Sequence, residues 1–202
     1  MDSPLLKQHF NQFSPLSEQD WNLLVPHMEF KTLGKGGLFA KEGKKAREVG
    51  FVLEGSLRQY YTRDGEEKTT YFYFEGHLMS AYISCITGTA SQMTIEALTE
   101  VRYIEFPYPV LTELFERSMG WQRLGRKIAE YLAIGLEERM VGLLTESPEA
   151  RYLHLLESHR HKIIERIPQH YIANYLGITP VSMSRIRNRV RTKKTLLASF
   201  TI

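Results

Sequence analysis

The chain has 202 residues, a length that suits one or two domains and allows a sizeable hydrophobic core. Hydrophobic residues make up 43% of it and charged residues 24%, the balance of an ordinary globular protein. No apolar run reaches the roughly 18 residues of a membrane span, and the N-terminus carries no signal-peptide core. We therefore expect a cytoplasmic protein without a membrane partner.

The composition also limits the chemistry that the chain can perform. Cys85 is the only cysteine, which excludes an internal disulfide and a zinc or iron–sulfur site made of four thiolates. His154, His159 and His161 are close in sequence, but their spacing fits no metal template. No activated nucleophile or acid–base pair stands out. We therefore expect no metal, no cofactor and no enzymatic activity, and Cys85 is either a buried thiol or a redox sensor.

Charge is divided unevenly along the chain. Residues 1–150 hold 16 Lys and Arg against 21 Asp and Glu, a net charge of −5. Residues 151–202 hold 10 Lys and Arg against 2 Asp and Glu, a net charge of +8, and no acidic residue follows Arg166. This asymmetry predicts an acidic body joined to a small basic module, and nucleic acid is the partner that suits such a module.

The sequence from residue 14 to residue 118 predicts a short helix followed by many short strands. Ser17 and the acidic residues after it form a start typical of a capping box. Asp64-Gly65, between two tyrosine-rich runs, predicts a hairpin turn. Short strands at a spacing of about ten residues, with no crossover helix between them, predict a β-sandwich or a small jelly roll. The clearest strand-like runs are 50–53, 56–62, 69–74, 93–97 and 101–106.

Residues 119–145 contain no proline and predict one long helix. An apolar seam with 3-4-3-4 spacing runs along it, which is typical of a coiled coil, and we interpret this seam as the surface that pairs two chains. A second apolar stripe is expected to pack on the chain's own domains; the alternative is an ordinary core helix in a monomer. The seam consists of Trp121, Leu124, Ile128, Tyr131 and Gly135, and the second stripe of Leu132, Leu136, Met140 and Leu143.

A third region begins at Ser147-Pro148, which supplies an N-cap and a first-turn proline for a helix. Residues 167–190 then predict a short helix, a turn at Gly177 and a second helix that is capped by Thr179. On this second helix Met183, Ile186 and Val190 share an inward face, and a neighbouring face carries Ser182, Arg185 and Arg189. The pattern is that of a helix-turn-helix.

Taken in order, these segments resemble the Crp/Fnr family of bacterial transcription regulators. The resemblance implies an α+β fold with an N-terminal β-roll (jelly roll) of the cyclic nucleotide-binding type over 1–118 and flanking helices. It also implies a dimerisation and connector helix over 119–146 and a winged-helix-like DNA-binding domain over 147–202. Residues 192–202 alone follow the recognition helix, so we expect a shortened or absent wing. The matching segments are Glu42-Gly43-Lys44-Lys45-Ala46, Phe51-Val-Leu-Glu-Gly55, Glu75-Gly76 and 167–190.

The resemblance implies a homodimer that binds double-stranded DNA at a palindromic operator and acts with RNA polymerase. Arg185 is expected to bond a guanine edge, whereas Val181, which stands where Fnr-like members carry glutamate, favours a thymine methyl group. Thr179 and Ser182 are candidate phosphate contacts. The alternative for the cations of 187–194 is a solvated charge run. The expected DNA-binding residues are Gln169, His170, Thr179, Val181, Ser182, Ser184, Arg185, Asn188 and Arg189.

The chain departs from the cyclic-AMP-binding members where those members hold their ligand. Ser80-Ala81-Tyr82 replaces their Gly-Glu-Leu, and Ser91-Gln92 replaces the Arg-Ser that neutralises the phosphate. Because a buried phosphate without a cation is costly, cyclic AMP is expected to bind weakly at best. Haem is not expected, since Tyr82 stands about where haem-binding members carry histidine. The expected effector-pocket residues are Met79, Ser80, Ala81, Tyr82, Ser91, Gln92, Met93 and Tyr131.

The sequence therefore predicts a sequence-specific DNA-binding regulator, with two interpretations of its β-roll. The β-roll either senses an unidentified small molecule or is a scaffold whose pocket is filled by Tyr82, Met79 and Met93. The alternative function is a cyclic-nucleotide- or small-molecule-responsive module that regulates a partner protein. Arg185 and the basic C-terminal region favour DNA as the partner.

Overall fold

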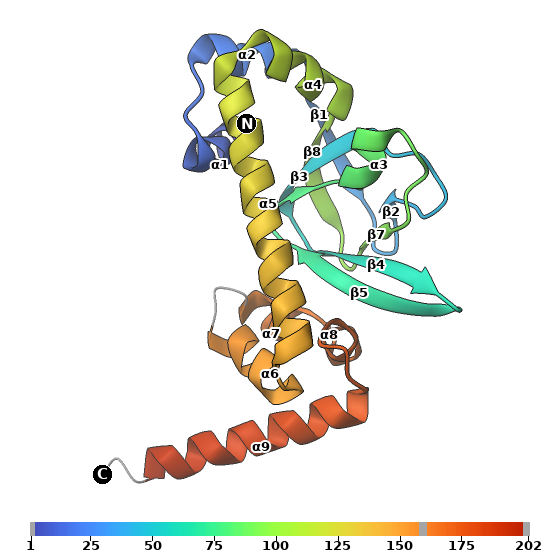
Figure 1. Cartoon of the computed structure of the whole chain (residues 1–202), viewed down its shortest axis with the longest axis vertical. Helices are drawn as coiled ribbons and strands as arrows, with labels where there is room; N and C mark the ends of the chain where they lie inside the picture. The colour runs from blue at the N-terminus through green and yellow to red at the C-terminus, as the bar shows by residue number, and fades with distance from the viewer. Residues whose placement is uncertain (1–2, 158–160, 200–202) are drawn as a thin grey trace. The chain divides into compact units, whose positions relative to one another are not determined.

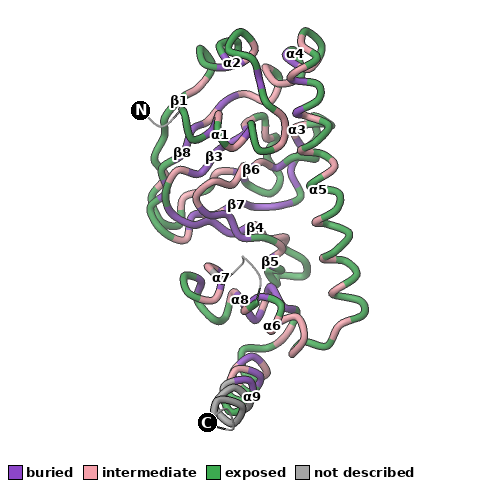
Figure 2. The backbone as a smooth tube through the Cα atoms, turned by 90° about the vertical axis from the view of Figure 1, so that its left-hand side faces the viewer, coloured by how far each residue is buried: buried purple, intermediate pink, exposed green. Residues whose placement is uncertain are grey.

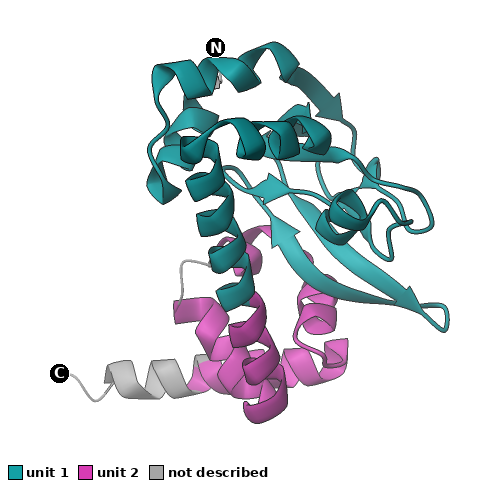
Figure 3. Cartoon of the chain, turned by 45° about the horizontal axis from the view of Figure 1, so that its top comes forward, with its two compact units in different colours: residues 1–135 teal, residues 136–202 magenta. Residues whose placement is uncertain are grey.

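The computed structural model describes residues 3–157 and 161–199, with side chains except at residues 3, 161, 191 and 193–199. Figure 3 shows that the chain divides into two compact units, residues 1–135 and 136–202. The long helix α5 (Met119–Thr145) begins in the first unit and ends in the second. In the described ranges, no helix combines the length and the apolar character that crossing a membrane requires.

The first unit is built around two four-stranded antiparallel sheets, ordered β1-β8-β3-β6 and β2-β7-β4-β5 (Figure 1). This arrangement confirms the predicted jelly roll of short strands and the α+β class. The five predicted runs correspond to β3, β4, β5, β7 and β8, and three further strands complete the sheets. The bounds are β1 (Glu29–Leu33), β2 (Leu38–Ala40), β3 (Glu48–Glu54), β4 (Leu57–Arg63), β5 (Glu66–Tyr73), β6 (Leu78–Met79), β7 (Thr94–Ala97) and β8 (Val101–Pro107).

The hairpin between β4 and β5 forms where the sequence predicts it. Arg63 pairs with Glu66, so the turn has two residues, Asp64 and Gly65. Both have left-handed backbone, with φ of 54° and 78°, which is the geometry of a type I′ turn. Aspartate and glycine adopt this conformation at little cost, and the turn therefore fixes the register of the two strands.

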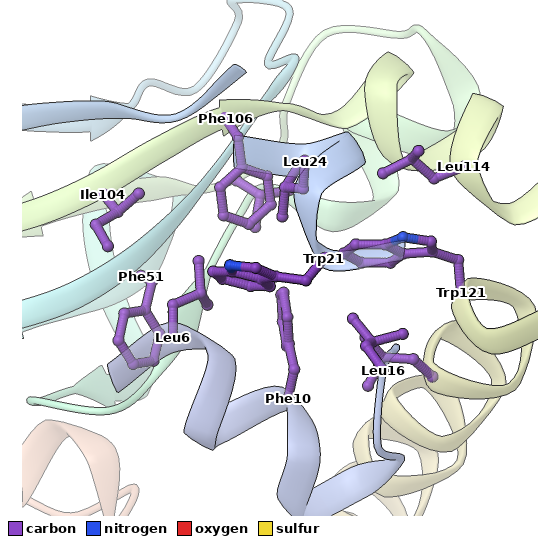
Figure 4. Close-up of a cluster of buried hydrophobic side chains, with 12 residues drawn as sticks. Leu6, Phe10, Leu16, Trp21, Leu24, Phe51, Ile104, Phe106, Leu114 and Trp121 are labelled. Carbon is purple, nitrogen blue, oxygen red and sulfur yellow. The ribbon is translucent and has the colours of Figure 1, made fainter. Parts of the chain in front are cut away.

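The first unit has one hydrophobic core inside the roll and another on the outer side of the sheet that contains β3 and β8. Helices cover this outer side and complete the second core with it (Figure 4). The predicted helix is α2 (Glu18–Leu24), with Ser17 Oγ accepting from the Asp20 amide at 3.0 Å. Helix α1, which the sequence analysis does not predict, adds Leu6 and Phe10 to this core. The remaining covering elements are α1 (Ser3–Phe13), the 3₁₀ turn η1 (Val25–His27), α4 (Tyr108–Arg117) and the first turns of α5.

A hydrogen-bonded network fixes the start of α5. Ser118 Oγ accepts from the amides of Gly120 and Trp121 at 3.1 and 3.3 Å, which caps the helix. The same hydroxyl donates to Asp20 at 2.5 Å, and Ser17 donates to the other carboxylate oxygen at 2.7 Å. These hydroxyl donors, Ser118 foremost, hold the pKa of Asp20 below its usual value. The carboxylate of Asp20 on α2 therefore holds the residue that caps α5.

Two residues of the expected dimer interface lie instead in this core. Trp121 and Leu124 are each 1% exposed and belong to the chain's own core. The Trp121 ring meets the Phe10 ring edge to face at 5.7 Å between centroids, and its Nε1 donates to the Asp20 carbonyl at 3.0 Å. The expectation that these two residues pair two chains is wrong, because α1 and α2 already cover them.

The second apolar stripe of α5 also differs from the expectation, since its four residues are exposed among the described parts of the chain. Leu132, Leu136, Met140 and Leu143 are 40%, 70%, 55% and 43% exposed. Ile128 packs at the edge of the N-terminal core, whereas Tyr131 is largely exposed. The seam is therefore buried in the chain's own core at Trp121 and Leu124, and the second stripe is exposed.

The second unit consists of the end of α5 and four helices. Ser147 Oγ accepts from the Ala150 amide at 3.2 Å and caps α6, as the sequence predicts. Each of the four helices carries buried apolar residues, among them Leu155, Ile163, Ile172 and Met183, and buried residues are purple in Figure 2. The helices are α6 (Pro148–Glu157), α7 (His161–Arg166), α8 (Gln169–Tyr175) and α9 (Pro180–Ser199).

Replacing Trp121 with alanine tests its place in the chain's own core. Because the indole is fully buried and hydrogen-bonded, Trp121→Ala is expected to lower the free energy of unfolding by about 3–5 kcal/mol. Urea unfolding of the whole chain, followed by circular dichroism, measures this change. Arg123→Ala, at an exposed position of the same helix, is the control and is expected to change stability by less than about 0.5 kcal/mol. Unchanged stability in Trp121→Ala would contradict the assignment.

Candidate functional site

Helices α8 and α9 and the turn between them contain each predicted part of the C-terminal motif. Helix α8 ends at Tyr175, and Gly177 follows with φ of 71°, a left-handed conformation that ends a helix. The Gly177 amide donates to the Asn174 carbonyl at 3.0 Å. Thr179 Oγ1 then accepts from the Ser182 amide at 3.2 Å and caps α9. This turn orients α9 against α8.

The two faces of α9 differ in their surroundings. Its inward residues Met183, Ile186 and Val190 are buried, as predicted. Val181 is 61% exposed, and Arg185, Asn188 and Thr192 are exposed at the spacing that places all four on one line. We call these four residues the recognition stripe. The Arg185 guanidinium has no ion-pair partner among the described residues.

The candidate phosphate contacts are placed in different ways. Gln169 and His170 are exposed at the start of α8, and the His170 ring lies 4.0 Å from the Tyr171 ring. Thr179 Oγ1 is engaged as the cap of α9 and also donates to Ser182 Oγ at 3.0 Å. Of the remaining candidates, Ser182 and Ser184 are half-buried.

Arg189 differs from Arg185 because it already has a carboxylate partner. Its Nη1 lies 3.0 Å from Glu149 Oε2, in the first turn of α6, and the Glu149 side chain is 20% exposed. Sequence reasoning missed Glu149, since no local pattern connects it with a residue forty positions later. The arginine therefore belongs both to the basic face and to the contact between α6 and α9.

The basic run continues past the described side chains. Arg191, Lys193 and Lys194 belong to it, but their side chains lie outside the described residues. Residues 192–199 continue α9 as helix, so the described part of the chain contains no wing strand after the recognition helix. Residues 200–202 lie outside the described residues, as does His159.

The interior of the β-roll is filled by the chain's own side chains where the effector is expected. Met79, Ala81 and Met93 are buried in its core. A Cβ added at Gly50 would lie 2.5 Å from the Met79 Cε, so the glycine makes room for this methionine. Tyr82 lies at the surface on α3 (Tyr82–Thr87) and not in the interior, contrary to the filled-pocket interpretation.

The other expected pocket residues are not gathered around one space. The buried Ser91 donates its hydroxyl to the Met93 carbonyl at 2.8 Å and accepts from the Met93 amide at 3.1 Å. Ser80 is half-buried, and Gln92 is exposed. Tyr131 is exposed on α5, with its ring 5.4 Å from the Phe13 ring. The polar groups at Ser91 are therefore engaged within the backbone of the roll.

A buried arginine of the β-roll is already neutralised. Arg58 is 4% exposed and donates to Glu96 from Nε and Nη2 at 2.9 and 2.6 Å. It also donates to Glu67 at 2.6 Å and lies over the Tyr60 ring at 4.1 Å. Arg102, at the surface, is 3.3 Å from Glu54. These arginines are held by carboxylates, so an anionic ligand would have to compete with them.

Cys85 is half-buried on α3, with its Sγ 3.8 Å from the Glu48 carbonyl. Burial, together with the negative charge of the nearby Glu48 carboxylate, raises the pKa of this thiol to about 11. His154, in turn, pairs with Glu146 at 3.2 Å. No cluster of three or more metal-ligating side chains occurs in the part of the chain that the structure describes.

Comparisons with known proteins agree with this architecture. Residues 30–118 match the family model of the cyclic nucleotide-binding domain. No curated protein sequence matches the chain. FixK2 from Bradyrhizobium japonicum is similar in structure, with a TM-score of 0.69 and 19% identity over 83% of this chain and 86% of that one.

Two further solved structures support the same conclusion. A protein from Eubacterium rectale, assigned to the Crp/Fnr transcriptional regulators, gives a TM-score of 0.67 and 19% identity over 88% of this chain and 85% of its own. The catabolite activator protein of Thermus thermophilus gives 0.54 and 19% over 89% of this chain and 85% of that one. At these identities the likeness concerns the fold and not the ligand. The chain therefore has a Crp/Fnr-like fold, in which residues 30–118 match a cyclic nucleotide-binding domain.

Proposed function

We propose that this chain is a homodimeric, sequence-specific DNA-binding transcription regulator of the Crp/Fnr type, cytoplasmic and without catalytic activity. The observation that carries the proposal is the exposed recognition stripe of α9, which lies opposite the buried Met183, Ile186 and Val190. A helix with this division of faces fits the major groove while its other face stays packed on the protein. The net charge of +8 over residues 151–202 supports a polyanionic partner.

The side chains of the recognition stripe suit base edges. The planar fork of Arg185 matches guanine O6 and N7, and the Asn188 amide matches adenine N6 and N7. Val181, exposed at the first turn of α9, offers an apolar surface to a thymine methyl group. Gln169 and His170, which are exposed at the start of α8, are the proposed contacts to the sugar–phosphate backbone. RNA polymerase is the further partner that this function implies.

A second copy of the chain is the proposed partner of α5. Leu132, Leu136, Met140 and Leu143 are exposed along one face of a helix, and their 4-4-3 spacing suits packing against an identical helix. A row of exposed leucines on a helix is a surface that water solvates poorly. The interface therefore lies farther along α5 than the sequence predicts. Trp121 and Leu124 are removed from it, and Ile128, Tyr131 and Gly135 border it.

For the β-roll we propose a scaffold or a sensor of a ligand other than cyclic AMP. Met79 and Met93 fill its interior, and Ser91 is engaged in local hydrogen bonds. Arg58 is neutralised by two carboxylates, so it would have to leave them in order to neutralise a buried phosphate. Weak binding of cyclic AMP remains a prediction. A redox role for Cys85 is disfavoured because burial raises the pKa of its thiol to about 11, which lowers the fraction of reactive thiolate below that of an ordinary cysteine.

A second candidate function is a regulatory module that acts on a partner protein. The match of residues 30–118 to the cyclic nucleotide-binding domain fits this candidate as well, because such a domain is compatible with either output. Electrophoretic binding to genomic DNA fragments separates the candidates. The regulator retards a subset of fragments in the presence of competitor DNA, whereas the module retards none.

The reading of bases is tested at Arg185. Arg185→Ala is expected to cost roughly 1–3 kcal/mol per half-site and to relax the preference at one base pair, because the guanine loses its bidentate partner. Selection of binding sites from a random pool measures this change. Gln169→Ala is the control: loss of a contact to the sugar–phosphate backbone is expected to weaken binding to all sequences alike and to leave the preference at each base pair unchanged. An Arg185→Ala protein that selects the wild-type operator with undiminished discrimination would remove Arg185 from this role.

The dimer interface is tested at Leu136, which at 70% is the most exposed residue of the α5 stripe. Leu136→Glu would bring two like charges together at the twofold seam, so we expect monomers in analytical ultracentrifugation. Leu5→Glu, at an exposed leucine of α1, is the matched control and is expected to leave the dimer intact. A wild type that sediments as a monomer at micromolar concentration would contradict the interface.

The state of Cys85 is tested by alkylation with iodoacetamide, since the chain has one cysteine and the label reports one site. With the pKa raised to about 11, the folded protein is expected to react about 100-fold more slowly at neutral pH than the urea-unfolded chain. The rate should rise about tenfold per pH unit until the pH approaches that value. Equal rates in the folded and unfolded protein would restore the redox-sensor interpretation.

A further inference from the structure

Two arginines meet the C-terminal end of α8, directly before the turn that leads into α9. Arg139, on α5, donates from Nη2 to the Tyr175 carbonyl at 2.8 Å, and its guanidinium lies 3.7 Å from the centre of the Tyr175 ring. Arg151, on α6, donates from Nη2 to the Leu176 carbonyl at 2.9 Å. Carbonyls at the end of a helix lack intrahelical partners and carry partial negative charge, so two cations stabilise them.

Arg151 also holds the end of α5. Its Nη1 donates to the Glu146 carbonyl at 2.6 Å and to the Gly142 carbonyl at 3.4 Å. One planar guanidinium therefore joins the C-terminal end of α5 to the C-terminal end of α8. In the described residues Arg151 has no carboxylate partner, and its hydrogen bonds go to backbone carbonyls. The planar fork of the guanidinium, which can donate to several carbonyls at once, therefore explains why an arginine occupies this position.

We propose that Arg139 and Arg151 are positioning residues that fix α9 relative to the last turns of α5, and thereby set the half-site spacing that the dimer accepts. We call the two residues the carbonyl clamp. The inference rests on the proposed function, because the last turns of α5 carry Leu136, Met140 and Leu143 of the proposed dimer interface. Leu176, which Arg151 holds, is four residues before the first residue of α9.

The physical consequence concerns distance between two recognition helices and not the reading of bases. In a twofold dimer, a rigid joint between α5 and α9 places the two copies of α9 at one separation, about one helical turn of DNA, ~34 Å. Moving the half-sites apart by one base pair shifts and rotates one of them, and a rigid dimer cannot follow without strain. A dimer with a loosened clamp can follow, at the cost of affinity for the best operator.

The test compares operators whose half-sites are separated by the selected spacing or by one base pair more or less. We expect the wild type to prefer the selected spacing by about tenfold or more. The double variant Arg139→Gln, Arg151→Gln is expected to reduce this preference to less than about threefold, while keeping the base preference within each half-site. Arg151→Lys, which keeps the charge but loses the planar fork, is expected to fall between them. Arg126→Gln is the control, since Arg126 pairs with Glu130 on the exposed surface of α5.

A role in stability alone predicts a different result. It would weaken binding to all spacings by the same factor and leave the ratio at the wild-type value, and that outcome would overturn the proposal. Circular dichroism identifies a variant that fails to fold. In that case the single variants Arg139→Gln and Arg151→Lys are compared with the wild type on the same operators.

A measurement without DNA keeps this inference distinguishable from the proposed function. In a Cys85→Ser background, nitroxides at Glu138→Cys on α5 and Asn188→Cys on α9 report the distance between the two helices, with labelled chains diluted into unlabelled chains. The wild type should give one narrow distribution, and the double clamp variant a broader one. If the wild type binds no operator, the proposed function fails. If both proteins give the same narrow distribution, the clamp fails.

Discussion

The burial of Trp121 is the constraint on which the rest of the chain depends. Once the indole is packed against Phe10 and bonded to the Asp20 carbonyl, the rotation of α5 about its own axis is fixed. With about 3.6 residues per turn, the positions that continue the helix past the N-terminal core are determined as well. Leu136 then emerges on a face that the described chain leaves exposed. In the proposed dimer, the anchoring that closes the first core would therefore also determine which face of α5 meets the second copy.

Local signals account for the parts of the structure that the sequence predicts. The Asp64-Gly65 turn, the Ser17 and Thr179 caps and the inward Met183 depend on residues a few positions apart, so they are visible in a single sequence. The helix 119–145 and the two-helix motif follow from the same kind of pattern. These elements were sufficient to predict the α+β class and the candidate recognition helix.

Contacts between distant segments account for what the sequence does not predict. A periodic seam shows which residues share a face, but it does not show what covers that face. For this reason the sequence pattern predicts that Trp121 lies in a dimer interface, although α1 covers it. The same holds for Glu149 beside Arg189 and for Arg151 beside the Leu176 carbonyl. Backbone carbonyls as partners leave no trace in the sequence, so the clamp could not have been predicted.

The β-roll has the architecture of a cyclic nucleotide-binding domain, but its interior differs from that of a cyclic-nucleotide site. The strand order and the match over residues 30–118 identify the architecture. Its interior, however, is occupied by Met79 and Met93, and Arg58 is bound by Glu96 and Glu67. The fold of the β-roll therefore does not by itself identify a ligand.

The ion pair between Arg189 and Glu149 limits what Arg189 can contribute to the proposed binding of DNA. An unpaired arginine that meets a phosphate releases a condensed cation from the DNA, and each release steepens the dependence of affinity on salt. In the proposed complex with DNA, Arg189 would first have to leave the Glu149 carboxylate before it could meet a phosphate. The free energy of this ion pair would then be subtracted from what Arg189 contributes to binding. Arg185, which has no ion-pair partner among the described residues, would meet the DNA without this cost.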